Sequence, residues 1–330
     1  MKRFFISTVL VLGLLYGTHD TLAGTEQDPL AGAQHDYNDG DYNRAVDTLT
    51  NAIAKSPNDA TLHFLLGQCY YELGEFARAS ASLESAVQLS PKQSEYHDWL
   101  GKSYGRRAET SVFLSAMSWA RKTHKEFEIA VQFDPTNFEA QRDLIRYEMN
   151  APGIVGGGDD KALKHIEEVE KINSLQGLLA RGEFFATKRR LGEGDAVFAK
   201  ILESNSDRIG IYLEAADYYR DRQNGDKMGK AVADAQRIDP NDRRLKFYKG
   251  TLLVLKGKSP AEAESLLKSY LATVPDHSEL PPHSAAREWL GKLYESQERF
   301  SEATQEYRAS LDLDPHNKEV EEALKRVEKK

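Results

Sequence analysis

The sequence predicts an all-α fold, in which helical hairpins stack side by side into an α-solenoid. One observation is local: residues 60–91 contain two runs of apolar residues at helical spacing, and Gly74 separates the runs. Another is periodic, because Pro57 and Pro91 stand 34 residues apart and each follows such a second run. A hairpin with apolar residues on more than one side cannot bury them alone, so it requires stacked neighbours.

The best hairpin, residues 60–91, is predicted to consist of two closely packed helices. Gly67 and Ala79 stand where the helices cross, and their small side chains let the two backbones approach. Pro91 prevents the second helix from continuing. The residues that set the pattern are Leu66, Gly67, Tyr70, Gly74, Phe76, Ala79, Leu83, Ala86 and Pro91. These positions match the consensus of the tetratricopeptide repeat (TPR), so the stretch resembles the TPR family.

The spacing continues along the chain in about eight TPR-like hairpins. We expect N-terminal repeats over residues 24–150 and C-terminal repeats over residues 151–330 to form one continuous right-handed superhelix. Residues 317–330 carry one apolar stripe on a charged helix, which is typical of a helix that caps the end of a stacked array. His277 and His283 flank a short proline-containing connector, and both are predicted to be exposed.

The third hairpin is ten residues longer than the repeat allows, and the extra residues lie near 107–121. The apolar residues of this insertion are Val112, Phe113, Leu114, Met117 and Trp119. This apolar content predicts a packed helical structure rather than a loose loop. Two interpretations remain open, an elongated helix pair with additional core or a projecting edge that binds a partner.

A glycine-rich segment, residues 152–158, interrupts the fourth hairpin, whose second helix is expected to resume at Asp159. A glycine-rich loop before a helix is also typical of phosphate-binding sites. Here no Gly-Lys-Ser/Thr follows, no apolar strand precedes the loop, and Asp159 and Asp160 would repel an anion. The sequence therefore predicts a widened turn that displays Ile154 and Val155. A similar turn is found in uncharacterised exported bacterial TPR proteins, which assigns no activity.

Residues 1–23 have the pattern of a secretory signal peptide, with Lys2 and Arg3 before an apolar run and a small-residue cleavage site after it. The apolar run is shorter than the roughly 20 residues that span a membrane. We expect cleavage before Gly24, a periplasmic or secreted protein, and no stable membrane insertion after cleavage. An uncleaved leader that acts as an anchor is the alternative.

The chain has 44 basic and 52 acidic residues, and removal of the predicted leader changes its formal charge from −8 to −9. Nucleic acids and anionic membranes are bound through positive fields, so the overall charge disfavours both as partners. Cys69 is the only cysteine and lies among helix-packing residues. It is predicted to be a buried apolar group rather than a reactive thiol.

No motif in the sequence predicts catalysis, a metal site or a cofactor. The histidines form no His-Glu-x-x-His pattern, a thiolate site lacks its second cysteine, and no Gly-x-Ser-x-Gly occurs. The acidic residues lie at spacings typical of solvated helix faces. We therefore expect that the protein is not an enzyme and uses neither cofactor nor metal.

The concave groove is the predicted binding surface, because repeat arrays commonly bind partners there. The TPR resemblance implies that the first helix of each repeat lines this groove, which places on it Phe64, Gln68, Tyr71, Lys102, Arg106, Arg142 and Arg146. Four of these are basic, so the predicted ligand is a protein or peptide, either acidic or with a C-terminal carboxylate. In the alternative interpretation the bases pair with Glu95, Asp98 and Glu139 and only make the groove soluble.

Together the patterns predict a non-enzymatic scaffold or adaptor of the cell envelope that binds a partner protein or peptide through the concave groove. The alternative is an enzyme, or an essential subunit of a cell-envelope enzyme complex, with a site formed by the inserted segments. In both hypotheses the departures from the regular repeat are the candidate functional regions.

Overall fold

The structure is a computed structural model that describes residues 28–330, and within them the chain forms α-helices and no β-strand. The predicted signal peptide and its cleavage site lie outside the described residues. The helices are α1 (Pro29–Asn38), α2 (Tyr42–Lys55), α3 (Ala60–Glu72), α4 (Phe76–Leu89), α5 (Ser94–Glu109), α6 (Phe113–Phe133), α7 (Phe138–Asn150), α8 (Asp159–Ile172), α9 (Ser174–Thr187), α10 (Leu191–Leu202), α11 (Ile209–Asp221), α12 (Gly225–Ile238), α13 (Leu245–Leu255), α14 (Pro260–Thr273), α15 (His283–Ser296), α16 (Phe300–Leu313) and α17 (Lys318–Val327). A 3-10 turn, η1 (Gly153–Val155), lies between α7 and α8.

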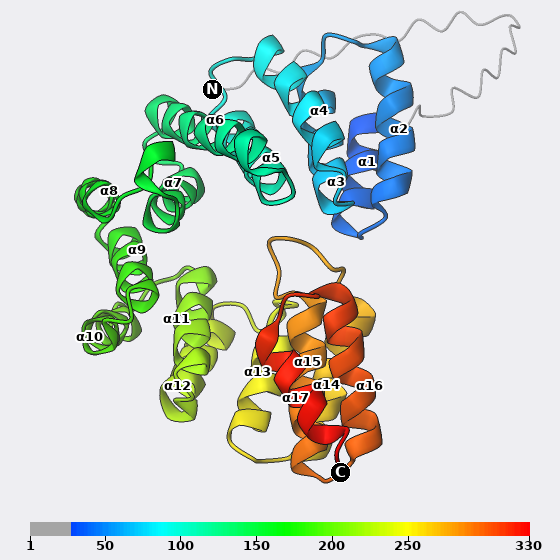
Figure 1. Cartoon of the computed structure of the whole chain (residues 1–330), viewed down its shortest axis with the longest axis vertical. Coiled ribbons are helices and arrows are strands. Elements are labelled where there is room, and N and C mark those ends of the chain that lie inside the picture. The colour runs from blue at the N-terminus through cyan, green and yellow to red at the C-terminus, as the bar shows by residue number, and fades with distance from the viewer. Residues whose placement is uncertain (1–27) are drawn as a thin grey trace, which may run out of the picture.

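Consecutive helices pair as hairpins, from α1–α2 to α15–α16, and α17 packs on α16. The hairpins follow one another along a strongly curved array (Figure 1). From α1 to α15, each odd-numbered helix also contacts the next odd-numbered helix, whereas the even-numbered helices of the described chain make no comparable contacts with one another. The odd-numbered helices therefore lie on the inner side of the curve. The prediction of an all-α solenoid of eight hairpins with a C-terminal capping helix is confirmed.

Small residues at the helix crossings explain why these hairpins close tightly. A Cβ added at Gly67 would lie 2.5 Å from Cγ of Leu83, and Ala79 beside it is fully buried. Gly101 and Gly291 take the same position in their hairpins, where an added Cβ would meet an aromatic ring at 2.6 and 2.5 Å. A larger side chain at these positions would separate the paired helices.

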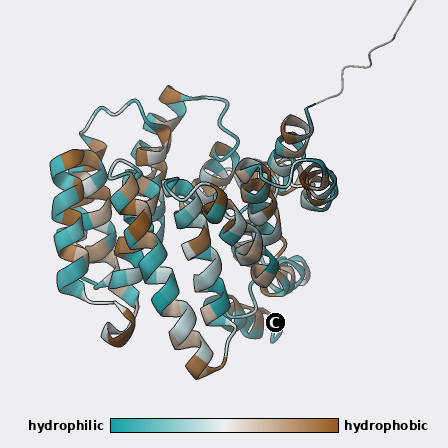
Figure 2. Ribbon diagram, turned by 90° about the horizontal axis from the view of Figure 1, so that it is seen from above, coloured by the Kyte–Doolittle hydropathy of each residue, from teal (hydrophilic) through white to brown (hydrophobic). Residues whose placement is uncertain are grey.

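The core is divided among the stacked hairpins, and apolar and polar residues share almost every helix (Figure 2). The largest buried cluster runs from Ile145 in α7 to Val327 in α17, and two smaller clusters lie within the first hairpins. Cys69 is buried in one of these, as predicted, and burial raises the pKa of its thiol to about 12. No helix within residues 28–330 combines the length and the hydrophobicity that crossing a membrane requires.

The residues inserted near 107–121 lengthen a helix pair. Helix α5 ends at Glu109, and α6 begins at Phe113 and continues for 21 residues. Near the body of the array, the ring of Trp119 stacks on Tyr104 at a centroid distance of 5.3 Å. The end of the pair instead leaves its apolar residues exposed to solvent. The base of the insertion therefore adds core and its tip projects, while binding of a partner at the tip stays a prediction.

The glycine-rich segment, residues 151–158, folds against the first insertion. The Tyr147 hydroxyl of α7 lies 2.7 Å from the carbonyl oxygen of Ala120 in α6 and 2.8 Å from that of Val155 in η1. This hydroxyl joins the two inserted segments, which lie far apart in the sequence. Helix α8 then begins at Asp159, as predicted.

The connection between α14 and α15, residues 274–282, crosses to the first hairpins, and we call it the closing loop. The backbone N–H and the hydroxyl of Ser278 donate to the Glu72 carboxylate at 3.0 and 2.6 Å. The Tyr42 hydroxyl donates to the carbonyl oxygen of Asp276 at 2.8 Å. These partners stand 206 and 234 positions apart in the sequence. The loop therefore joins the two ends of the curved array (Figure 1).

The histidines of this connector correct one prediction. His277 is buried, and its ring lies edge-on to Tyr37 with centroids 5.0 Å apart. His283 is partly buried, and its Nε2 lies 2.8 Å from the carbonyl oxygen of Val274. The prediction of two exposed histidines is wrong because the loop folds onto α1–α3 instead of crossing solvent.

Candidate binding groove

The inner side of the first three hairpins contains two adjoining hollows. One, of about 630 Å³, is lined by residues of α1, α3 and α5 and by Glu279 of the closing loop. The other, of about 450 Å³, is lined by α5, by the residues that lead into α7, and again by Glu279. Glu95 also lines both hollows. We therefore treat the two hollows as one groove, the inner groove.

The aromatic residues predicted for the groove form part of its wall. Phe64 stacks on Tyr96 with ring centroids 4.4 Å apart, and Gln68 lies beside it in the first hollow. The ring of Tyr71 meets Trp99 edge-on with centroids 5.4 Å apart. The structure thus brings Phe64 and Gln68 to the groove, whereas Tyr71 packs on Trp99 and lines neither hollow.

Lys102 is enclosed by carboxylates. Its Nζ lies 2.8 Å from Oδ2 of Asp98 on the same helix and 3.1 Å from Oδ2 of Asp143 on α7. Burial alone would lower the pKa of Lys102, but the two carboxylates outweigh this effect and raise it. The amine is therefore charged and already engaged.

The two arginines of α7 reach acidic residues on later hairpins. Nη1 of Arg142 lies 2.7 Å from Oε1 of Glu214 in α11, and Nε of Arg146 lies 2.5 Å from Oε1 of Glu183 in α9. The sequence suggested Glu95, Asp98 and Glu139 as partners of the four bases. Of these three, only Asp98 forms an ion pair with one of the bases, Lys102. The pairing partners were missed because they stand 37 and 72 positions away and meet α7 only through the curvature of the array.

Arg106 is held locally. Its guanidinium pairs with Glu109 one turn later and lies over the ring of Phe76, 4.9 Å from the centroid. All four bases predicted to line the groove therefore contact carboxylates of the chain itself.

The second hollow carries an excess of negative charge. Its lining includes the carboxylates of Glu95, Asp98, Asp134, Glu139 and Glu279 and the amines of Lys92 and Lys102. The Asp98 side chain is almost fully buried, and its Oδ1 has no hydrogen-bond partner within residues 28–330. Burial raises the pKa of Asp98 to about 7, although Lys102 opposes this shift. A further cation in this hollow would reduce the repulsion among these carboxylates.

Glu279 is the residue of the groove that sequence reasoning missed. Glu95 lines the same two hollows as Glu279. The pKa of Glu95 is raised, first by burial and then by the charge of Glu279. Residue 279 lies in the connector between α14 and α15, so the helical periodicity does not connect it with Glu95. The sequence feature that could have indicated this position of Glu279 is Pro281-Pro282, because consecutive prolines favour an extended connector that can cross a gap.

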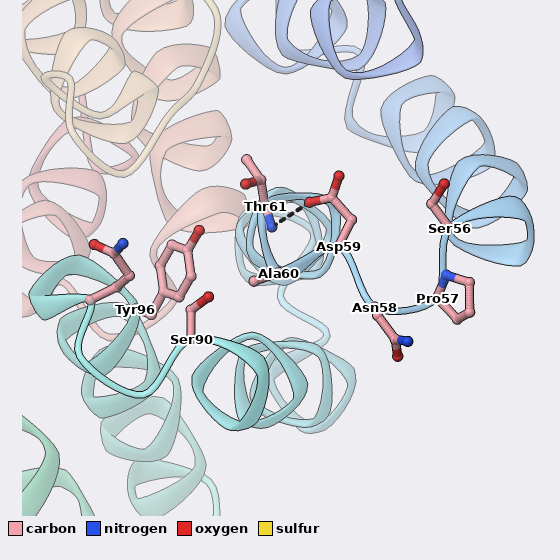
Figure 3. Close-up of a pocket in the computed structure, with 9 residues that line it drawn as sticks. Ser56, Pro57, Asn58, Asp59, Ala60, Thr61, Ser90 and Tyr96 are labelled. Atoms are coloured by element: carbon pink, nitrogen blue, oxygen red, sulfur yellow. Dashed lines mark hydrogen bonds between the residues drawn. The ribbon is translucent and has the colours of Figure 1, made fainter.

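A separate hollow lies where the chain enters α3 and α5 (Figure 3). Polar residues of the two turns form its walls. Asp59 accepts a hydrogen bond from the backbone N–H of Thr61 at 2.9 Å, so its carboxylate caps α3. We assign this hollow to the turn structure rather than to ligand binding.

The glycine-rich segment does not present its amides to an anion. The N–H of Gly157 donates to the carbonyl oxygen of Pro152, and the N–H of Gly158 donates to that of Glu148. A phosphate loop needs such groups to point at its ligand. This geometry agrees with the widened turn predicted from the sequence. The prediction that the turn displays both Ile154 and Val155 is wrong for one of them, since Ile154 is 66% exposed but Val155 is buried.

A buried carboxylate lies where the two insertions meet. Glu148 is 1% exposed, and its oxygens face His165 Nδ1 at 2.7 Å and His124 Nε2 at 3.5 Å. Burial opposes ionisation, but the two imidazoles outweigh it and lower the pKa of Glu148. The three residues come from α6, α7 and α8, so no sequence motif could reveal them. Among residues 28–330, no group of His, Cys, Asp and Glu side chains is arranged to hold a metal ion.

Family models identify two segments of the chain. Residues 37–102 and residues 276–318 each match a tetratricopeptide repeat model. The matched segments contain the complete α3–α4 and α15–α16 hairpins. These are the second and eighth repeats of the sequence pattern.

The chain is also similar to solved tetratricopeptide repeat proteins. One from Thermus thermophilus is 16% identical, covers 69% of this chain and 98% of its own, and has a TM-score of 0.46. One from Parabacteroides merdae is 17% identical, covers 91% and 97%, and has a TM-score of 0.45. The C-terminal part of one from Cytophaga hutchinsonii is 19% identical, covers 89% and 99%, and has a TM-score of 0.42. No curated protein sequence matches the chain. At these identities the likeness concerns helical repeats and not function.

Proposed function

We propose that this tetratricopeptide repeat protein is a non-enzymatic scaffold of the cell envelope that binds a partner protein or peptide in the inner groove. The observation that carries the proposal is the groove itself, in which α1, α3, α5, the start of α7 and the closing loop line two adjoining hollows. Repeat arrays commonly bind partners on this surface. Export to the periplasm or the medium is part of the proposal and rests on the pattern of residues 1–23.

The ligand chemistry that we propose is a basic segment rather than an acidic one. An acidic peptide or a C-terminal carboxylate, as the sequence predicted, requires free bases. Lys102, Arg142 and Arg146 already contact carboxylates of the chain. The second hollow instead offers an excess of carboxylates. A Lys or Arg side chain of a partner has the charge and the donors that this hollow lacks.

Binding of fluorescent peptides to the purified chain tests this proposal. Two peptides of equal length, one rich in Lys and Arg and one rich in Asp and Glu, are titrated at low and high salt. We expect the basic peptide to bind at least about tenfold more tightly, with an affinity that falls as salt rises. Preference for the acidic peptide would favour the original prediction instead.

Paired variants locate the binding to the groove. Glu95→Gln together with Glu279→Gln is expected to weaken the basic peptide by about tenfold, because both carboxylates line both hollows. Glu167→Gln together with Glu262→Gln removes the same charge from exposed positions on α8 and α14 and should bind like the wild type. An equal loss in both double variants would mean that net charge, and not the groove, attracts the peptide.

The enzymatic alternative would use the place where the inserted segments meet. That place contains Glu148, which is buried between His124 and His165. Because these groups satisfy one another, we assign the cluster to the packing of α6, α7 and α8 and propose no catalytic role for it.

A further inference from the structure

The end of the α5–α6 pair exposes an unusual apolar surface. Val112, Phe113 and Leu114 are 78%, 75% and 79% exposed, which makes them the most exposed large apolar side chains within residues 28–330. They are consecutive and lie where α6 begins, at the tip of the elongated pair. Contiguous exposed apolar residues on a soluble protein mark a site of interaction with a protein or a membrane. We call residues 112–114 the apolar tip.

One face of α6 continues from this tip and changes character along the helix. Its side chains line a shallow hollow of about 370 Å³ and are, in order, Leu114, Met117, Ser118, Arg121, Lys122 and Lys125. The intervals of three and four residues between positions 114, 117, 121 and 125 place them on one side of the helix. At 1.5 Å per residue, Arg121 stands about 10 Å and Lys125 about 17 Å behind Leu114 along the axis.

The cations behind the tip are available to a partner. Arg121 and Lys125 are exposed and form no ion pair with any carboxylate of the described chain. Lys122 lies over the Trp119 ring, 4.6 Å from its centroid, which leaves its charge at the surface. Residues 106–125 contain five Lys and Arg and only one acidic residue, in a chain with a formal charge of −8. The charge of this region is thus opposite to that of the whole molecule.

We propose that the apolar tip docks on the surface of an anionic phospholipid membrane. Successive residues of a helix point about 100° apart, so the three apolar side chains spread around a convex end. A convex apolar end fits a fluid medium, whereas a protein partner would have to provide a matching hollow. Interfacial segments bury their apolar part about 5–10 Å deep. Insertion to this depth brings Arg121 and Lys122 to the level of the lipid phosphates and leaves Lys125 about 6 Å farther out.

The same charges fix the orientation of the bound protein. The rest of the chain is acidic and is repelled by an anionic surface, so only the cationic region around the tip can approach it. The protein would stand on the end of the α5–α6 pair and leave the inner groove facing away from the lipid or parallel to it. This proposal does not depend on the ligand of the groove.

Co-sedimentation with lipid vesicles tests the proposal. The processed protein, purified after export with its N-terminus verified, is mixed with vesicles of phosphatidylcholine alone or with phosphatidylglycerol added. We expect at least about tenfold stronger binding to the vesicles that contain phosphatidylglycerol, and a decrease of this binding as salt rises. Absence of binding to both kinds of vesicle would overturn the proposal.

Two pairs of variants separate the tip from general effects. Phe113→Ser with Leu114→Ser is expected to reduce vesicle binding by about tenfold or more, because the apolar contact with the lipid is lost. Ile172→Ser with Leu313→Ser removes apolar side chains that are 45% and 50% exposed on other hairpins, and should bind normally. Both variants change surface residues, so circular dichroism should report unchanged helix content.

Charge reversal provides the second comparison. The variant Arg121→Glu with Lys125→Glu should lose the preference for phosphatidylglycerol. The control variant Lys164→Glu with Lys230→Glu changes the net charge by the same amount at exposed positions elsewhere and should retain this preference. Equal effects of test and control variants would overturn the proposal. So would cross-linking of the tip to a protein without vesicle binding, because the site would then be a protein interface.

Discussion

At the scale of single residues, His97 in α5 is held between two hydrogen-bond acceptors. Its Nδ1 lies 2.6 Å from Oε2 of Glu126, and its Nε2 lies 2.9 Å from the carbonyl oxygen of Pro91. A neutral imidazole has one N–H, so both contacts are hydrogen bonds only when the ring is protonated. Burial opposes this charge, but the bonds to Glu126 and Pro91 outweigh it and raise the pKa of His97 above 6.5.

This raised pKa predicts a stability that depends on pH. The contribution of His97 is complete below the unfolded-state pKa of about 6.5 and is lost as pH rises through the higher pKa of the folded state. We expect His97→Gln to lower the free energy of unfolding in urea by about 1–2 kcal/mol at pH 6. The difference from the wild type should shrink by pH 8.5.

His63 provides the control, because it stands 34 positions earlier, at the equivalent place in its repeat. Its Nε2 lies 2.9 Å from the carbonyl oxygen of Pro57, and no carboxylate of the described chain pairs with it. His63→Gln therefore measures the loss of the backbone contact without the carboxylate. An effect of His97→Gln that does not change with pH would show that the His97 ring is neutral.

Contacts of single residues also differ in whether the sequence predicts them. The roles of Gly67 and Ala79 were predictable, because both belong to one hairpin with a known spacing. The pairing of Arg142 with Glu214 was not, because it depends on how three successive hairpins curve. A repeat period describes the contacts within a unit and leaves the angle between units undetermined.

At the scale of elements, the two insertions form one substructure. The repeat period revealed how many residues were added near 107–121, and their apolar content predicted the packed helical structure that lengthens α5 and α6. No pattern indicated that the glycine-rich segment would pack on α6 through Tyr147. Such contacts depend on shape complementarity between segments that share no periodicity.

The glycine-rich segment allows a prediction at this scale. A Cβ added at Gly157 would lie 1.7 Å from the carbonyl oxygen of Ala151, whereas one added at Gly153 would meet nothing within 4 Å. Because the backbone itself blocks the first position, Gly157→Ala should lower the free energy of unfolding by about 2–4 kcal/mol. Gly153→Ala should change it by no more than about 0.5 kcal/mol. Urea denaturation measures both, and equal tolerance would show that the segment adopts another conformation.

At the scale of the whole molecule, the closing loop turns a curved array into a ring. Glu72 receives two hydrogen bonds from Ser278, and Tyr42 donates one to Asp276. An added Cβ at Gly40 would lie 2.7 Å from Pro275, so the loop also fits closely against the turn between α1 and α2. The sequence identified this segment correctly as a short connector, but its target is more than 200 residues away. No local rule predicts a contact over such a distance.

Weakening the closing loop should open the ring. Tyr42→Phe with Ser278→Ala removes two hydrogen bonds of about 1 kcal/mol each, which shifts the balance between closed and open forms by about thirtyfold. Spin labels on α2 and α16 should then report longer and more widely distributed distances. Thr50→Ala with Ser85→Ala removes hydroxyls that bond only within their own helices and should leave the distances unchanged. Unchanged distances in the first variant would mean that these bonds do not hold the ring closed.

The closing loop also has a consequence for the order in which the protein folds. In an ordinary repeat array each unit contacts only its neighbours, so folding can proceed from one end to the other as the chain emerges. Here the last contacts of α1–α3 cannot form until residue 278 has been synthesised. A polypeptide that ends before residue 274 could build its hairpins but would lack the closing loop, which brings Glu279 to the groove. The groove is therefore completed only after the closing loop has been synthesised. Its presence distinguishes a chain that contains the closing loop from a shorter, unfinished chain.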